Sequence, residues 1–145
     1  MLYSELINKA IDIAYSAHHG QRDKSGRPYF LHPVVVASQM DNEYETCAAL
    51  LHDVIEDTNI TLGELEKIFP REITEAVSIL THKEGVDYLD YIREIKRNPI
   101  ARKVKLADLN HNMDITRLGR ANAQDIEAFN KRMKKYELAQ QILSE

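Results

Sequence analysis

Residues 50–58 read LLHDVIEDT, a stretch in which apolar and charged side chains alternate closely. The leucines, the valine and the isoleucine predict a helix with one buried face. On one continuous helix, residues three or four apart lie within about 5–6 Å at their Cβ atoms, so the polar residues would share one rim. Those residues are His52, Asp53, Glu56 and Asp57. Acids this close repel one another and are costly to bury unless a cation offsets them, so the stretch predicts a divalent metal site.

The remainder of the chain shows the same helical periodicity. Further helices are expected up to Ala17, from Pro33 with His32 at the cap, over 45–57, from Thr61 to about Phe69, over 71–81, 87–98 and 99–115, and from about Asn122 onward. Thr61 and Glu64 form a capping-box pattern, and Pro99 suits a first helical position. The only β-like run, residues 34–36, is too short to build a sheet. We therefore expect an all-α fold, a compact bundle of about eight helices forming a single domain over residues 1–145.

Composition narrows the classes of function. The chain has 145 residues, 43% hydrophobic and 29% charged, an ordinary globular balance, and a net charge of −4. That charge argues against a nucleic-acid partner, although a small anionic substrate remains compatible with a local metal and basic residues. Cys47 is the only cysteine, which excludes a disulfide framework and favours a cytoplasmic location. The first residues predict an amphipathic helix rather than a secretion signal, and no run is apolar enough to cross a membrane.

A metal at the 50–58 stretch needs ligands from elsewhere in the chain. The candidates are His32, held before a proline, and Asp108, which follows an apolar helical run. With His52 and Asp53 they form a mixed imidazole–carboxylate set without thiolate, which suits manganese, iron or zinc in a site with open positions. Taken singly, His32 could instead be a core or capping histidine, and Asp108 could pair with Lys105 or Arg102. His111 is expected to be structural, and His18 and His19 to meet solvent or a helix end.

Three motifs in this order resemble a known family. HPVVVA at 32–37, ALLHDVIEDT at 49–58 and VKLADLNHNM at 104–113 are similar to the metal-dependent HD hydrolase domain of the Rel/SpoT alarmone enzymes. With GQRDKSGRPYFLHP before them, they look most like the stand-alone small alarmone hydrolases of the Mesh type. The resemblance is clear from about Ala17 to Asn112 and fainter toward both ends.

The resemblance implies a site and a reaction. It implies that His32, His52, Asp53 and Asp108 bind Mn²⁺, and that Glu56 and Asp57 are a catalytic pair acting on the attacking water. It also implies that Lys24 lies near the phosphates and that Asn112 contacts the nucleotide, and the basic loop adds Arg22 to the substrate-binding residues. The substrate implied is guanosine tetra- or pentaphosphate, cleaved at its 3′-pyrophosphate to give GDP or GTP and pyrophosphate.

Three positions depart from the family pattern and leave the substrate open. Asp23 stands where the family commonly has an arginine that stacks on the base, Leu109 where it has arginine or lysine, and Ile115 where it has threonine. We expect Asp23 to weaken polyanion binding, so that Asp23→Arg would lower KM for ppGpp. The same metal chemistry on an adenine alarmone or NADPH is the second reading. A nucleotide-sensing binding module with little turnover is the third, and Glu56 and Asp57 argue against it. The sequence does not fix the oligomeric state.

Overall fold

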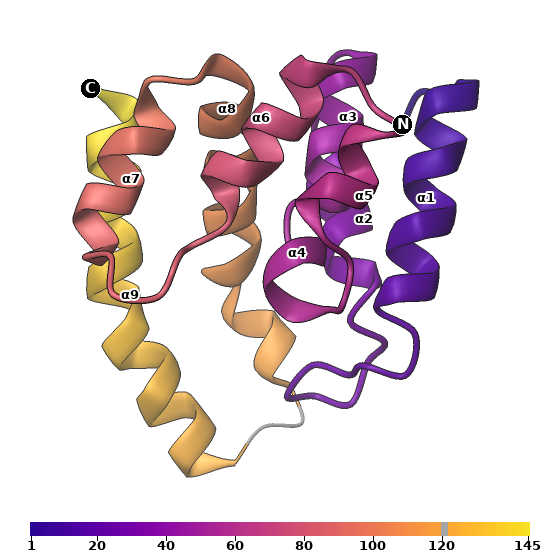
Figure 1. Cartoon of the computed structure of the whole chain (residues 1–145). Helices are drawn as coiled ribbons and strands as arrows, with labels where there is room; N and C mark the ends of the chain where they lie inside the picture. Colours follow the sequence, from indigo (N-terminus) through magenta and orange to yellow (C-terminus); the bar gives the residue numbers. More distant parts are fainter. Residues whose placement is uncertain (120–121) are drawn as a thin grey trace.

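Helices follow one another along the chain in the computed structural model, which describes residues 1–119 and 122–145 (Figure 1). No β-strand occurs within these two ranges, and residues 34–36 lie in a helix. The prediction of an all-α bundle is therefore confirmed. The elements are α1 (Glu5–Ala17), α2 (Leu31–Ser38), α3 (Glu43–Leu51), α4 (Val54–Asp57), α5 (Leu62–Glu66), α6 (Arg71–Leu80), α7 (Tyr88–Lys96), α8 (Pro99–Asn112), the 3₁₀ helix η1 (Ile115–Leu118) and α9 (Ala123–Ser144).

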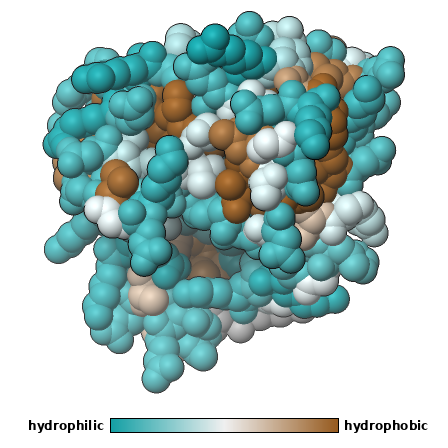
Figure 2. All heavy atoms as spheres, in the orientation of Figure 1, coloured by the Kyte–Doolittle hydropathy of each residue, from teal (hydrophilic) through white to brown (hydrophobic). Residues whose placement is uncertain are grey.

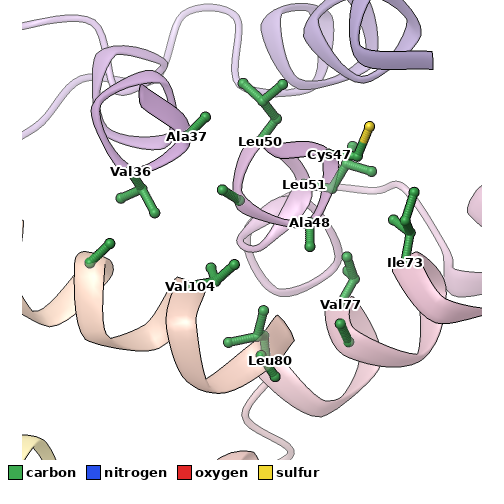
Figure 3. Close-up of a cluster of buried hydrophobic side chains, with 14 of the residues drawn as sticks. Val36, Ala37, Cys47, Ala48, Leu50, Leu51, Ile73, Val77, Leu80 and Val104 are labelled. Atoms are coloured by element: carbon green, nitrogen blue, oxygen red, sulfur yellow. The ribbon is translucent and has the colours of Figure 1, made fainter. Parts of the chain in front are cut away.

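The short helix α3 is the centre of the core. It packs against α1, α2, α6 and α8, and its residues 46–51 are all buried. Figure 3 shows apolar side chains of α2, α3, α6 and α8 pointing toward one another, among them Val36, Leu51, Val77 and Val104. Cys47 belongs to this core, and burial raises the pKa of its thiol to about 12. Because α3 is enclosed on several sides, the residues just after its end are held in a fixed place.

On the other side of α8, helices α7 and α9 complete the bundle. Helix α9 packs on α7 and α8 and buries Phe129, Ala139 and Leu143. In Figure 1, α9 runs down the edge of the bundle opposite α1, and the loop between α1 and α2 crosses the lower end. This arrangement brings the loop, α4, the end of α8 and part of α9 to one end of the molecule.

Local helix signals are confirmed at several ends. Thr61 and Glu64 make both hydrogen bonds of a capping box, although α5 ends at Glu66, before the expected Phe69. Pro99 is at the start of α8, and Asn122 caps α9 with a second capping box. These ends depend on hydrogen bonds between residues three apart, which is why sequence reveals them.

Two further differences from the expected helices affect the residues around His32 and His52. The expected helix over 45–57 is broken, because α3 ends at Leu51 and α4 begins at Val54. At the break the amide of His52 donates to the carbonyl of Ala49, three residues earlier, and Asp53 has φ −105° and ψ 0°. The expectation of His32 at a helix cap is also wrong. Turn hydrogen bonds from residues 31 and 32 to the carbonyls of 28 and 29 start α2 earlier, so that His32 lies inside its first turn.

Candidate metal centre

Four side chains from three parts of the fold meet at the lower end of the bundle. His32 comes from the first turn of α2, His52 and Asp53 from the break between α3 and α4, and Asp108 from α8. Each offers one ligand atom, and these atoms all lie within 4.8 Å of one another. His32, His52 and Asp108 are buried, and Asp53 is half-buried. The structure thus brings together the four residues proposed from sequence as ligands.

Two imidazole nitrogens and two carboxylate oxygens converge at this point. His32 Nε2 lies 2.8 Å from Asp108 Oδ1 and 3.8 Å from Asp53 Oδ2. His52 Nε2 lies 3.1 Å from Asp53 Oδ2 and 3.4 Å from Asp108 Oδ1. Such spacings suit ligands that surround a common centre.

The donor set fits a divalent cation. Among the residues that the structure describes, His52 Nε2 is buried without a hydrogen-bond partner, while Nδ1 lies 2.5 Å from the carbonyl of Ala49. Nδ1 therefore carries a proton and donates it in a hydrogen bond to the carbonyl. In the neutral ring this leaves the lone pair of Nε2 facing the cluster. Burial raises the pKa of Asp53, but the positive charge that His52 carries when its Nε2 is also protonated outweighs burial and brings that pKa to about 2. A pair of imidazoles with ionised carboxylates and no thiolate suits Mn²⁺, Fe²⁺ or Zn²⁺.

Neighbouring side chains hold the two carboxylates in place. The hydroxyl of Tyr29 donates to Asp53 Oδ2 at 2.5 Å. Lys105 Nζ lies 2.9 Å from Asp108 Oδ2, and Asn112 Nδ2 donates to Asp108 Oδ1 at 3.1 Å. Burial disfavours ionisation of Asp108, but the charge of Lys105 outweighs it and holds the pKa well below its usual range. The expected alternative for Asp108, a salt bridge with Lys105, is thus present on one oxygen, while the other oxygen faces the cluster.

Glu56 and Asp57 lie on α4 at the rim of a cavity of about 260 Å³ that three of the four clustered residues, His52, Asp53 and Asp108, partly line. Glu56 Oε1 accepts a hydrogen bond of 2.7 Å from the amide of His82, in the loop after α6. Burial, followed by the charges of Asp53 and Glu56, raises the pKa of Asp57 to about 6. A carboxylate with this pKa can accept a proton near neutral pH.

A second cavity, of about 290 Å³, adjoins the first. Tyr29, Asn112 and Tyr136 line both. The second cavity also brings together Arg22 and Lys24, the other two residues proposed to bind substrate. Figure 2, in the same orientation as Figure 1, shows a hollow in the lower half of the molecule, with hydrophilic atoms around the opening.

Sequence reasoning missed the part of this cavity that comes from the last third of the chain. Arg117 of η1 and Arg132 of α9 add two cations to its lining, and Phe129 and Tyr136 add aromatic surface. Residues 129, 132 and 136 are spaced for one helix face. That spacing is the signal that could have placed them together, but only the fold shows what the face meets.

The three positions that depart from the family pattern lie in different surroundings in the structure. Asp23 Oδ1 accepts hydrogen bonds from the amides of Ser25 and Arg27, at 2.9 and 3.0 Å, so this carboxylate closes the turn of the loop. Leu109 is fully buried in the core and is not among the residues lining the cavities. Ile115 is 58% exposed. Leu109 therefore does not reach the two cavities, whereas Asp23 both lines the second cavity and closes the turn of the loop.

Two other histidines lie closer to the centre than expected. His18 was expected to meet solvent or a helix end, but it is buried, with Nδ1 2.8 Å from Gln21 Oε1. His111 Nδ1 lies 2.7 Å from His32 Nδ1. Burial, followed by the charge of Arg117, lowers the pKa of His111 to about 4, which keeps its ring neutral.

Comparisons with known proteins show what this chain resembles. The family model described as HD domain matches residues 10–129. The bifunctional (p)ppGpp synthase/hydrolase SpoT of Escherichia coli K12 is 40% identical over 128 residues, covering 74% of this chain and 17% of that protein. A guanosine-3′,5′-bis(diphosphate) 3′-pyrophosphohydrolase of Borreliella burgdorferi is 36% identical over 137 residues, covering 82% of this chain and 20% of that protein. This chain therefore spans about a fifth or less of the length of these relatives.

The fold also matches a solved structure. That structure, titled as a metazoan ortholog of SpoT that hydrolyzes ppGpp, superposes with a TM-score of 0.67 at 22% identity, covering 99% of this chain and 96% of the other. The match supports the helical architecture. Over the parts of this chain that the structure describes, no helix has the length and apolar character needed to span a membrane.

Proposed function

The chain belongs to the HD domain family, and we propose that it is a metal-dependent phosphohydrolase that removes the 3′-pyrophosphate of ppGpp-type alarmones. One observation carries the proposal. A buried cluster of ligand atoms opens into a cavity with two acids on its rim, and that cavity adjoins a second one lined by four cationic side chains. The names of the two curated relatives describe hydrolysis of this substrate class.

The proposed cofactor is one Mn²⁺ ion held by His32, His52, Asp53 and Asp108. When bound, a divalent cation stabilises negative charge on the phosphate and lowers the pKa of the attacking water. The absence of thiolate from the cluster and the two carboxylate ligands support a metal of this type. Tyr29 and Lys105 would keep both carboxylates oriented toward the ion.

Other side chains of the protein would handle the attacking water and bind the substrate. Glu56 and Asp57 would orient the water and take its proton, since they lie beside the ligands without belonging to the cluster. Water attacks the phosphorus that is bonded to the 3′-oxygen, the bond between these two atoms breaks, and the 3′-oxygen takes up a proton. GDP or GTP then leaves, with pyrophosphate as the other product. The other phosphates would be attracted by the four cationic side chains of the second cavity, Arg22, Lys24, Arg117 and Arg132. Asn112 lines both cavities and would contact the nucleotide where the two cavities meet.

We propose that residues 1–145 act as one hydrolase domain in the cytoplasm, where phosphorylated nucleotides are found. The substrate is a small molecule, and the net charge of −4 argues against nucleic acid as a partner.

Product analysis tests the proposal. Purified protein with Mn²⁺ is incubated with ppGpp, ppApp, NADPH and GTP, and the products are separated by ion-exchange chromatography. We expect GDP and pyrophosphate from ppGpp, and no reaction with Asp108→Ala as the control. If NADPH were the only substrate hydrolysed, with release of phosphate, the result would favour the alternative in which the same metal chemistry acts on NADPH. No turnover of any substrate by the metal-loaded protein would favour the binding module.

A further inference from the structure

The two histidines of the metal centre are held in different ways. The Nδ1–H of His52 donates a hydrogen bond to the carbonyl of Ala49, a main-chain group that any residue at that position would supply. Within the described residues, the Nδ1 of His32 makes no hydrogen bond to a carbonyl. Its Nδ1 meets His111 Nδ1 at 2.7 Å, and its Nε2 lies 2.8 Å from Asp108 Oδ1 on the cluster side.

The geometry of the two rings is that of a hydrogen bond in the ring plane. The planes of His32 and His111 are 9° apart and the ring centroids are 5.0 Å apart. Rings packed face to face could not bring two atoms to 2.7 Å, because non-bonded contact begins at about 3.5 Å. The rings therefore lie almost in one plane and meet edge to edge. The lone pair of an imidazole nitrogen points outward in that plane, so one Nδ1 donates directly to the other.

Only one direction of this hydrogen bond suits a ligand. A metal-binding nitrogen must present its lone pair, so His32 has to carry its proton on Nδ1 and leave Nε2 free. His111 Nδ1 must then be the acceptor, with its own proton on Nε2. The main chain of His111 is also fixed, because the side chain of Arg117 donates a hydrogen bond of 3.1 Å to its carbonyl.

We propose that His111 is a positioning residue of the metal centre, which fixes the tautomer and ring orientation of His32 by accepting its Nδ1 proton. The inference rests on the proposed cation site. It predicts that the centre depends on the side chain at position 111, which is not in the cluster. Residues that orient a metal-binding histidine in this way typically change metal affinity by about 10–100-fold when they are replaced.

The test distinguishes the effect of the hydrogen-bond acceptor at position 111 from the effect of the shape of the side chain. His111→Asn places an amide oxygen near the position of Nδ1, and His111→Leu has the shape of asparagine without its polar atoms. His111→Phe keeps a flat ring without an acceptor. The exposed His19, outside the cluster, supplies the matched control His19→Phe. Each full-length protein is stripped of metal and titrated with Mn²⁺ in a calorimeter, and its melting temperature is measured without metal.

We expect the Kd for Mn²⁺ to rise about 10–100-fold in the Leu and Phe variants, and to stay within a few-fold of wild type in the Asn and His19 variants. If one of the two variants without an acceptor fails to fold, the other still gives the comparison with asparagine. Equal affinity in wild type and a folded Leu or Phe variant would overturn the inference while leaving the metal site intact. Equal loss in Asn and Leu would overturn the role as acceptor. Absence of Mn²⁺ binding in wild type would instead overturn the proposed function.

Discussion

Replacing Glu56 by glutamine removes a charge while leaving an anchor in place. Glu56 Oε1 accepts a hydrogen bond from the amide of His82, and the amide oxygen of glutamine can accept the same bond. The loop after α6 should therefore stay where it is. Glu56 is not in the ligand cluster, so the variant should still bind Mn²⁺. What it loses is a proton acceptor beside the attacking water.

The size of the effect follows from that role. General acid–base catalysis contributes about 10²–10⁴-fold, so kcat should fall by that factor, or about 3–5 kcal/mol in activation free energy. KM and metal content should change little. Asp57→Asn should behave similarly, and the double variant should lose less than the product of the two single losses, because residues acting as a unit are not additive.

The assay is release of pyrophosphate from ppGpp by metal-loaded protein, with metal content measured on the same samples. Glu56→Ala serves as the comparison, since it removes the anchor for His82 as well as the charge. Loss of metal from the glutamine variant would make Glu56 a ligand. Near-normal turnover in both the Glu56 and the Asp57 single variants would refute the catalytic pair.

Further predictions concern the metal, the loop and pH. His52→Ala and Asp108→Ala should each lose Mn²⁺ and activity together, and unchanged metal content in both would contradict the ligand set. Stripping metal with EDTA should lower the melting temperature, because a ligand at 100 times its Kd stabilises the native state by about 2.7 kcal/mol; identical melting curves would argue against a bound ion. Asp23→Arg removes the acceptor for two loop amides and should raise KM for ppGpp, whereas Asp23→Asn should leave it near wild type; a lower KM in the arginine variant would restore the view that its charge opposes substrate. The pKa of Asp57 is raised from 3.8 to about 6, so its contribution to the stability of the metal-free protein is present below about pH 4 and lost as pH rises through about 6. Carbon NMR should show this carboxyl titrating near 6 without metal and lower with it.

The sequence predicts the features that depend on local spacing. The helical class follows from periodicity, and the ends at Thr61, Pro99 and Asn122 follow from capping patterns within three residues. The cluster residues were proposed from the crowding of acids after Leu51 and from motif resemblance. Their convergence depends on the packing of α2, α3 and α8, which local spacing does not encode.

Other parts of the site depend on contacts between distant segments. The break at His52 and Asp53 occurs inside a sequence that is helical by periodicity, so its position could not be read from propensity. Lys105 reads as one of several charges on a helix, and only the fold shows it against Asp108. His111 reads as an ordinary histidine until the packing of α8 against α2 brings it to His32.

The carbonyl of Arg117 joins two segments that are far apart in the chain. It accepts hydrogen bonds from Ser25 Oγ and from Arg27, across 92 and 90 residues. The loop between α1 and α2 and the 3₁₀ helix should therefore detach as one cooperative unit, while the core around α3 stays closed. Their amide protons should exchange with solvent at similar rates, and faster than those of α3. Entry of a bulky nucleotide would then cost only the opening of this unit and none of the global unfolding free energy.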